Sequence, residues 1–274
     1  MRWINRQPGR VGNLALTLLP FVMLVVLYLV ASEARLAVNP NDKLLPSLSS
    51  FVDTMTRMMF EPDKRNGELL FWQDTLSSLL RLLAGLLVAA LLGLTVGVCN
   101  GMLPYARAGM GPLVRVLSMI PPMAVLPILF IVFGLGELSK VVLIVFGIAP
   151  FVMRDLQQRV QELPREQLIK AQTLGASSWQ ILLRVVLPQV TPRLLSALRL
   201  SLGPAWLFLI AAEAIASTDG LGYRIFLVRR YLSMDVILPY VVWITLLAYL
   251  MDLGLRQVSR LCFPWFHRGE EADA

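Results

Sequence analysis

Six long apolar runs limit the possible folds of this chain more than any other feature of its sequence. A helix needs about 20 apolar residues to cross the hydrocarbon core of a bilayer. Because the runs are continuous and do not alternate, helices are favoured over barrel strands. The sequence therefore predicts an all-α, polytopic membrane protein with about six transmembrane helices, at residues 14–31, 76–103, 113–133, 141–153 (extended from about 138), about 194–217 and 236–255.

The composition supports a membrane protein and argues against several other classes. Of the 274 residues, 57% are hydrophobic and only 16% are charged. The formal net charge of +7 would suggest nucleic acid as a partner of a soluble protein, but Lys and Arg gather in the cytoplasmic loops of membrane proteins. We therefore expect contact with lipid and none with nucleic acid. Two distant cysteines, Cys99 and Cys262, and the single histidine His267 give no support for a disulfide framework or a metal site.

Basic residues also predict the orientation. Arg2, Arg6 and Arg10 precede the first apolar run, and at about 18 residues this run exceeds the 7–15 residues usual for the apolar part of a signal peptide. A retained first helix is therefore favoured over a cleaved signal. Basic residues in segments 1–13, 104–112, 154–193 and 256–274 place these segments, and both termini, in the cytoplasm of a multi-pass inner-membrane protein.

The segment 162–192 is too polar to span the membrane and has the features of a helix–turn–helix. Apolar residues follow Pro164 at helical spacing, Gly175 is expected to break that helix, and Ser177 or Ser178 to cap the next. Pro188 and Pro192 are expected to end the second helix. Such an amphipathic pair inside the cell has no lipid partner, so we expect it to dock onto another protein.

This segment resembles the EAA loop of the permease subunits of type I ABC importers. The pattern of that loop is Glu-Ala-Ala, three residues, Gly, nine residues, an aliphatic residue, one more residue and Leu-Pro. Gly175, Val185, Leu187 and Pro188 are in register with it. Further along, Ala211-Ala212-Glu213 and Gly220-Leu221-Gly222-Tyr223 resemble the nitrate/sulfonate/taurine branch. The chain departs from the pattern at Ile169 and Lys170, which stand in place of the first Glu-Ala, so that Glu166 or Glu162 would have to supply the acidic group.

The resemblance implies a type I ABC importer transmembrane-domain fold and a set of partners. These are two cytoplasmic ABC ATPase subunits, a second permease copy, expected to make a homodimer, and an external solute-binding protein. No Walker A motif is present, so ATP and Mg are expected on the ATPase and no cofactor on this chain, which would not be an enzyme. Residues 1–75 would form an N-terminal helix and external loop with a short helix near 48–60, residues 76–255 the permease core with the coupling loop at about 154–193, and residues 256–274 a cytoplasmic tail. The residues expected to dock the ATPase are Glu166, Ala171, Leu174, Gly175, Ala176, Ser177, Trp179, Leu187 and Pro188.

Prolines and a carboxylate within apolar runs are candidates for the translocation path or its gate. Pro121, Pro122 and Pro127 interrupt the third run, where they would form either a pore-lining bend or a packing kink. Glu213 lies within an apolar stretch and either lines the path or pairs with Arg199 or Arg81.

Two further patterns concern helix packing. Asp252 is expected to pair with Arg256 four residues later. The small residues Gly85, Ala89, Gly93 and Gly97 recur every four positions, which is typical of close helix packing, either within the permease or at a dimer seam.

Two other functions would need sequence features different from those of an importer permease. An integral-membrane enzyme would need clustered His, Asp or metal ligands, and the sequence has one histidine. A self-sufficient channel or secondary carrier would not need the docking segment and would be expected to contain inverted repeats. The resemblance favours a small anion, such as nitrate, a sulfonate or taurine, as the transported solute.

Overall fold

The computed structural model describes residues 9–39, 42–62 and 67–266, which form helices and loops with no strand among them. The predicted all-α class is therefore confirmed. Arg2, Arg6 and His267 lie outside the described residues. The chain divides into two compact units, Met1–Leu69 with Val228–Val241, and Leu70–Leu227 with Val242–Ala274. The functional limits expected at residues 75 and 255 stay a prediction.

The first unit contains α1 (Arg10–Val38) and α2 (Leu48–Phe60). The helix expected near residues 48–60 is thus present, and it begins at Ser47, whose hydroxyl accepts a hydrogen bond from the amide of Ser50 at 3.3 Å. The connection between the helices is tied to α1, because the Tyr28 hydroxyl donates to the carbonyl oxygen of Pro46 at 2.6 Å. An ion pair between Arg35 and Asp42 at 2.6 Å holds the same loop.

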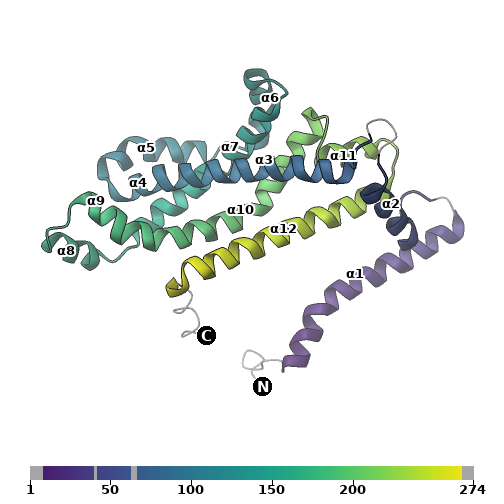
Figure 1. Ribbon diagram of the computed structural model, residues 1–274, viewed down its shortest axis with the longest axis horizontal. Helices are drawn as coiled ribbons and strands as arrows, with labels where there is room; N and C mark the ends of the chain where they lie inside the picture. The colour runs from purple at the N-terminus through teal and green to yellow at the C-terminus, as the bar shows by residue number, and fades with distance from the viewer. Residues whose placement is uncertain (1–8, 40–41, 63–66, 267–274) are drawn as a thin grey trace. The chain divides into compact units, whose positions relative to one another are not determined.

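The second unit is built around α7, which packs against α3, α6 and α10 (Figure 1). Two short π-helical segments interrupt the helices of this unit, at Gly93–Gly97 and Leu182–Val186. The last two helices, α11 and α12, each contribute residues to both units. The helices are α3 (Leu70–Leu92), α4 (Val98–Met102), α5 (Pro104–Leu117), α6 (Pro122–Phe133), α7 (Glu137–Gln161), α8 (Arg165–Thr173), α9 (Ser178–Ile181), α10 (Leu187–Ala216), α11 (Leu221–Arg229) and α12 (Met234–Cys262).

The stripe of small residues on α3 and on the π-helical segment that follows it packs against α7 of the same chain. A Cβ added to Gly85 would lie 2.8 Å from Cβ of Ile144, and one added to Gly97 would lie 2.8 Å from the carbonyl oxygen of Met153. Ala89, between them, is fully buried. The stripe therefore brings two helices of one chain into close contact, and its alternative interpretation as a dimer seam is wrong.

The helix that follows Gly175 is much longer than predicted. Residues Ser178–Ala216 form one continuous helical stretch, so Pro188 and Pro192 do not end a helix, and the span predicted from about residue 194 forms the second part of this stretch. Pro188 lies in the first turn of α10, directly after a π-helical segment in which the amide of Leu187 bonds the carbonyl of Leu182. A π-type turn of this kind rearranges the backbone hydrogen bonds next to a proline, so the chain continues as a helix.

The number of membrane spans is only partly confirmed. Four helical stretches in the described part of the chain are long and apolar enough to cross a membrane, and α5 with α6 makes a fifth if this bent pair is one span. The predicted run 141–153 lies in α7, which is not among these stretches. The predicted span 113–133 is not one straight helix, because α5 and α6 meet at 96°.

Candidate functional site

The predicted break between two helices lies where the sequence placed it. α8 ends at Thr173, and Gly175 has φ +78°, a left-handed conformation that glycine adopts without a steric penalty. The amide of Gly175 bonds the carbonyl of Gln172 at 2.9 Å, and the amide of Ala176 bonds the carbonyl of Ala171 at 3.0 Å. These two bonds form a Schellman motif, which terminates α8 and reverses the chain.

A capping box starts the next helix. The hydroxyl of Ser177 accepts from the amide of Gln180 at 3.3 Å, and the side chain of Gln180 accepts from the amide of Ser177 at 2.8 Å. The reciprocal pair satisfies two backbone donors of the first turn of α9. Of the two serines predicted as the cap, Ser177 is therefore the one that serves.

Large apolar side chains of this α8–α9 segment (residues 165–181) face solvent. Leu174 is 88% exposed and Trp179 is 65% exposed, and no residue of α8 is buried. Glu166 is exposed in the first turn of α8, where its negative charge interacts favourably with the helix dipole. Of the other expected docking residues, Gly175 and Ser177 are exposed, whereas Ala171, Ala176, Leu187 and Pro188 are half-buried.

Glu213 lies at the centre of a second cluster, which we call the Arg81 network. Its carboxylate is fully buried and lies 2.7 Å from Nη1 of Arg81. The hydroxyl of Ser78 donates to the same carboxylate at 2.8 Å, and the amide of Gly222 donates at 2.8 Å. Of the two partners that the sequence offered for Glu213, Arg81 is correct and Arg199 is wrong.

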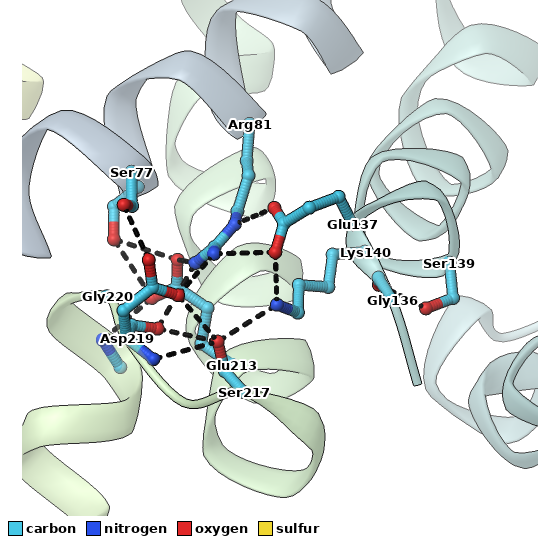
Figure 2. Close-up of polar contacts among 12 residues, drawn as sticks. Ser77, Arg81, Gly136, Glu137, Ser139, Lys140, Glu213, Ser217, Asp219 and Gly220 are labelled. Atoms are coloured by element: carbon cyan, nitrogen blue, oxygen red, sulfur yellow. Dashed lines mark hydrogen bonds and ion pairs between the residues drawn. The ribbon is translucent and has the colours of Figure 1, made fainter. Parts of the chain in front are cut away.

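Arg81 joins three acidic groups from different parts of the chain, as Figure 2 shows. Besides Glu213, the guanidinium of Arg81 binds Asp219 at 2.5 Å. The same guanidinium forms a bidentate ion pair with Glu137 at the start of α7. Lys140 lies 2.8 Å from Glu137 and donates to the hydroxyl of Ser217 at 2.9 Å. The network therefore fastens the middle of α3 to the start of α7, the end of α10 and the loop that follows α10.

The Gly220-Leu221-Gly222 motif closes this loop over the carboxylate of Glu213. Gly220 has φ +108°, and a Cβ there would lie 2.5 Å from Cδ of Glu213. Its amide donates to Asp74 at 2.9 Å, and the amide of Leu221 donates to Ser78 at 2.9 Å. A residue with a side chain would not fit at position 220, which explains the glycine.

The sequence reasoning did not identify Asp74, Glu137, Lys140 or Asp219 as members of this cluster. A signal was available for one of them, since Asp74 and Arg81 are seven residues apart on one helix and therefore share a face. Burial alone would raise the pKa of Asp219, but hydrogen bonds from Arg81 and Ser77 outweigh it and lower that pKa.

A second predicted ion pair has a different partner. The guanidinium of Arg199 contacts both oxygens of Asp252, at 2.7 and 2.9 Å. The expected pairing of Asp252 with Arg256 is therefore wrong. The bidentate pair between Arg199 and Asp252 makes two parallel hydrogen bonds to the carboxylate, which is stronger than a single contact.

The three prolines predicted for the path lie at and after the bend between α5 and α6. Pro121 precedes α6, Pro122 is its first residue and Pro127 lies inside it. Pro122 lines a cavity of about 370 Å³ beside this bend. Within residues 9–39, 42–62 and 67–266 there is no group of three or more His, Cys, Asp or Glu side chains placed to hold a metal ion.

Comparisons with known proteins show the family of the chain. The model of a family described as "Binding-protein-dependent transport system inner membrane component" matches residues 85–261. The taurine transport system permease protein TauC of Escherichia coli is 40% identical over 195 residues, which cover 71% of this chain and 70% of that protein. The bicarbonate transport system permease protein CmpB of Synechococcus elongatus is 32% identical over 220 residues, 78% of each chain.

A more distant relative and a solved structure extend the likeness. The putative aliphatic sulfonates transport permease protein SsuC of Bacillus subtilis is 26% identical over 264 residues, covering 96% of this chain and 92% of that protein. A chain of the MetNI methionine ABC transporter, in an inward-facing conformation, superposes with a TM-score of 0.62 at 21% identity. The superposition covers 73% of this chain and 99% of that one, and it supports the same fold.

Proposed function

Because the chain belongs to the family of binding-protein-dependent transport system inner-membrane components, we propose that it forms the translocation path for a small anion such as nitrate, a sulfonate or taurine. It is the permease subunit of an ABC importer and not an enzyme, and the ATPase is a separate chain. Relatives are named for taurine, aliphatic sulfonates and bicarbonate. These solutes share an acidic oxygen-bearing group, which supports an anion as the cargo of this chain.

The α8–α9 segment docks the ATPase in this proposal. The observation that carries it is the exposure of Leu174 and Trp179 on a short, well-capped helix pair. Large apolar side chains exposed together mark interaction surfaces. ATP and Mg would be bound by the ATPase alone, and closure of the ATPase would move this segment and, through the continuous helix Ser178–Ala216, the membrane part of the chain.

Further partners and the orientation complete the proposal. The family implies an ATPase and a solute-binding protein as partners and places the chain in the inner membrane as a multi-pass protein. We further propose that two copies of this chain form the pore within membrane lipid, with both termini in the cytoplasm. The α5–α6 bend with Pro121, Pro122 and Pro127 would act as a pore-lining hinge, while Glu213, which is fully buried, would hold the helices that move.

The proposal is tested by assembling the chain with its ATPase in liposomes and measuring ATP-driven uptake of labelled 2-aminoethanesulfonate. Leu174→Asp and Trp179→Asp are expected to abolish both co-purification of the ATPase and uptake, since a charge at the centre of an apolar interface removes its hot spot. Val52→Asp on α2, where an apolar side chain about as exposed as Trp179 is replaced, serves as the matched control. Full uptake by both α8–α9 variants would show that the segment does not dock the ATPase.

A further inference from the structure

A cavity of about 370 Å³ lies where the bend between α5 and α6 meets α7 and α10. We call it the junction cavity. Its volume falls in the range of pockets that hold small molecules. Polar and aromatic side chains line it together, and those that matter here are Ser118, Phe146, Arg154, Asp155 and Phe208.

Arg154 brings a positive charge to the junction cavity. Its Nη1 donates to the hydroxyl of Ser118 at 2.9 Å, and that hydroxyl donates to the carbonyl of Arg115 at 2.8 Å. Throughout the described ranges, no carboxylate lies within ion-pair distance of Arg154, whereas Arg81, Arg199 and Arg224 are all paired. Ser118 thus orients the guanidinium, and its remaining N–H groups are available to the two oxygens of an acid group.

Asp155 brings a negative charge to the same cavity. Its ion pair with Arg159 is long, at 3.7 Å, so its carboxylate keeps capacity for a second cation. A backbone acceptor lies nearby, because Pro150 has no N–H to bond the carbonyl of Phe146 one helical turn earlier, and both residues line the cavity. An ammonium group would find acceptors on this side.

Aromatic rings cover the wall of the cavity beside α10. The ring of Phe208 lies against the backbone of α7 at Gly147, where an added Cβ would come within 2.5 Å of Cδ2 of the ring. Phe146 and Phe208 both line the cavity. A short carbon chain would pack against these rings, while its charged ends reach the polar side chains.

We propose that the junction cavity binds a small zwitterionic organic acid, with Arg154 receiving its acid group and Asp155 its ammonium group. The inference rests on the proposed function and narrows its substrate class. A simple anion such as bicarbonate or an alkyl sulfonate would engage Arg154 alone, whereas a zwitterion would also place its ammonium group beside Asp155, whose pair with Arg159 is long, at 3.7 Å. This second charged contact favours the zwitterion over the simple anion.

The test uses the full chain in lipid nanodiscs, with binding of tritiated 2-aminoethanesulfonate measured and with ethanesulfonate and bicarbonate as competitors. Arg154→Gln is expected to weaken binding by at least about tenfold, the loss typical of a hydrogen bond to a charged group, and Arg154→Lys to recover part of it. Asp155→Asn is expected to weaken the binding of 2-aminoethanesulfonate but not the binding of ethanesulfonate. Arg57→Gln, which replaces an exposed arginine on α2 that does not line the cavity, should bind like the wild-type chain.

Three results would overturn the inference: no binding by the wild-type chain, unchanged binding by Arg154→Gln, or competition by ethanesulfonate equal to that of 2-aminoethanesulfonate. If Arg154→Gln fails to fold, Arg154→Lys and the competition series still decide. Uptake by the assembled transporter separates the two proposals. Uptake that does not depend on ATP contradicts the proposed function, whatever the cavity binds. ATP-driven uptake together with unchanged binding by Arg154→Gln contradicts only the proposed binding site in the junction cavity.

Discussion

The guanidinium of Arg81 on α3 and the carboxylate of Glu213 on α10 lie 2.7 Å apart, 132 residues apart in sequence, and both side chains are buried. An unpaired charge in that position would be costly in protein or in lipid. Glu213 has four hydrogen-bonding contacts within the chain, from Ser78, Arg81 and Gly222. The pair therefore holds α3 and α10 together, and a carboxylate so fully occupied is not available to a solute.

Removing one partner of this pair should destabilise the protein strongly. Arg81→Leu leaves Glu213 buried without its cation, and the free energy of unfolding should fall by about 3–5 kcal/mol. The double variant Arg81→Leu/Glu213→Leu should recover part of the loss, because both charges are gone. Thermal unfolding in detergent measures this, with the exposed pair Arg159–Glu162 as control. An Arg81→Leu variant as stable as one with that surface pair removed would contradict the structural role.

Gly220→Ala should also destabilise the protein, and for two reasons. The left-handed φ of +108° disfavours alanine, and its Cβ would meet the carboxylate of Glu213. Gly203→Ala is the matched control, because nothing lies within 4 Å of a Cβ at that position on α10 and alanine favours a helix by up to about 1 kcal/mol. Equal melting temperatures for the two variants would refute the proposed close approach.

Gly175→Asp is expected to separate ATP hydrolysis from uptake while leaving membrane insertion intact. Aspartate at φ +78° strains the turn between α8 and α9 and adds a charge beside Leu174. Gly175→Asn should keep more uptake, since asparagine tolerates the left-handed conformation without the charge. Uptake per ATP hydrolysed, measured in liposomes, distinguishes the variants. Normal coupling in Gly175→Asp would count against docking by this segment.

The stability that Asp219 contributes should depend on pH. Its pKa in the folded protein is lower than usual, so its ion pair with Arg81 stabilises fully above the unfolded pKa of about 4 and is lost as pH falls through the folded value. The difference in melting temperature between wild type and Asp219→Asn should be constant from about pH 5 to pH 8 and shrink below about pH 4. A difference that grows on acidification would contradict the shift.

A bulky residue on the glycine stripe should push the π-helical segment Gly93–Gly97 away from α7. Gly97→Leu places its side chain against the backbone of Met153, since even a Cβ would lie 2.8 Å from that carbonyl oxygen. Overpacking of this kind typically costs about 1–3 kcal/mol. Gly109→Leu on α5, with nothing within 4 Å, is the control for helix propensity and size. The measurement is yield and melting temperature in detergent, and equal values would contradict the packing.

Local chemistry was enough to predict several features of this chain. The lengths of the apolar runs predicted an all-helical membrane protein, because a backbone in lipid must satisfy its own hydrogen bonds. Gly175 and Ser177 predicted the α8–α9 turn, since the helix stop and the cap each depend on a few neighbouring residues. The spacing of Gly175, Val185, Leu187 and Pro188 identified the family, which the match over residues 85–261 confirms.

Partners across long sequence separations were decided by the tertiary structure alone. Arg81 could have paired with several carboxylates, and only the packing of α3, α7 and α10 brings Glu137, Glu213 and Asp219 to it. Asp252 had a plausible partner four residues away, yet it binds Arg199 on another helix. Pro188 looks like a helix end in sequence, but the π-helical turn before it lets the helix continue. A cap depends on adjacent residues, whereas an ion pair depends on where whole helices lie, and packing sets those positions.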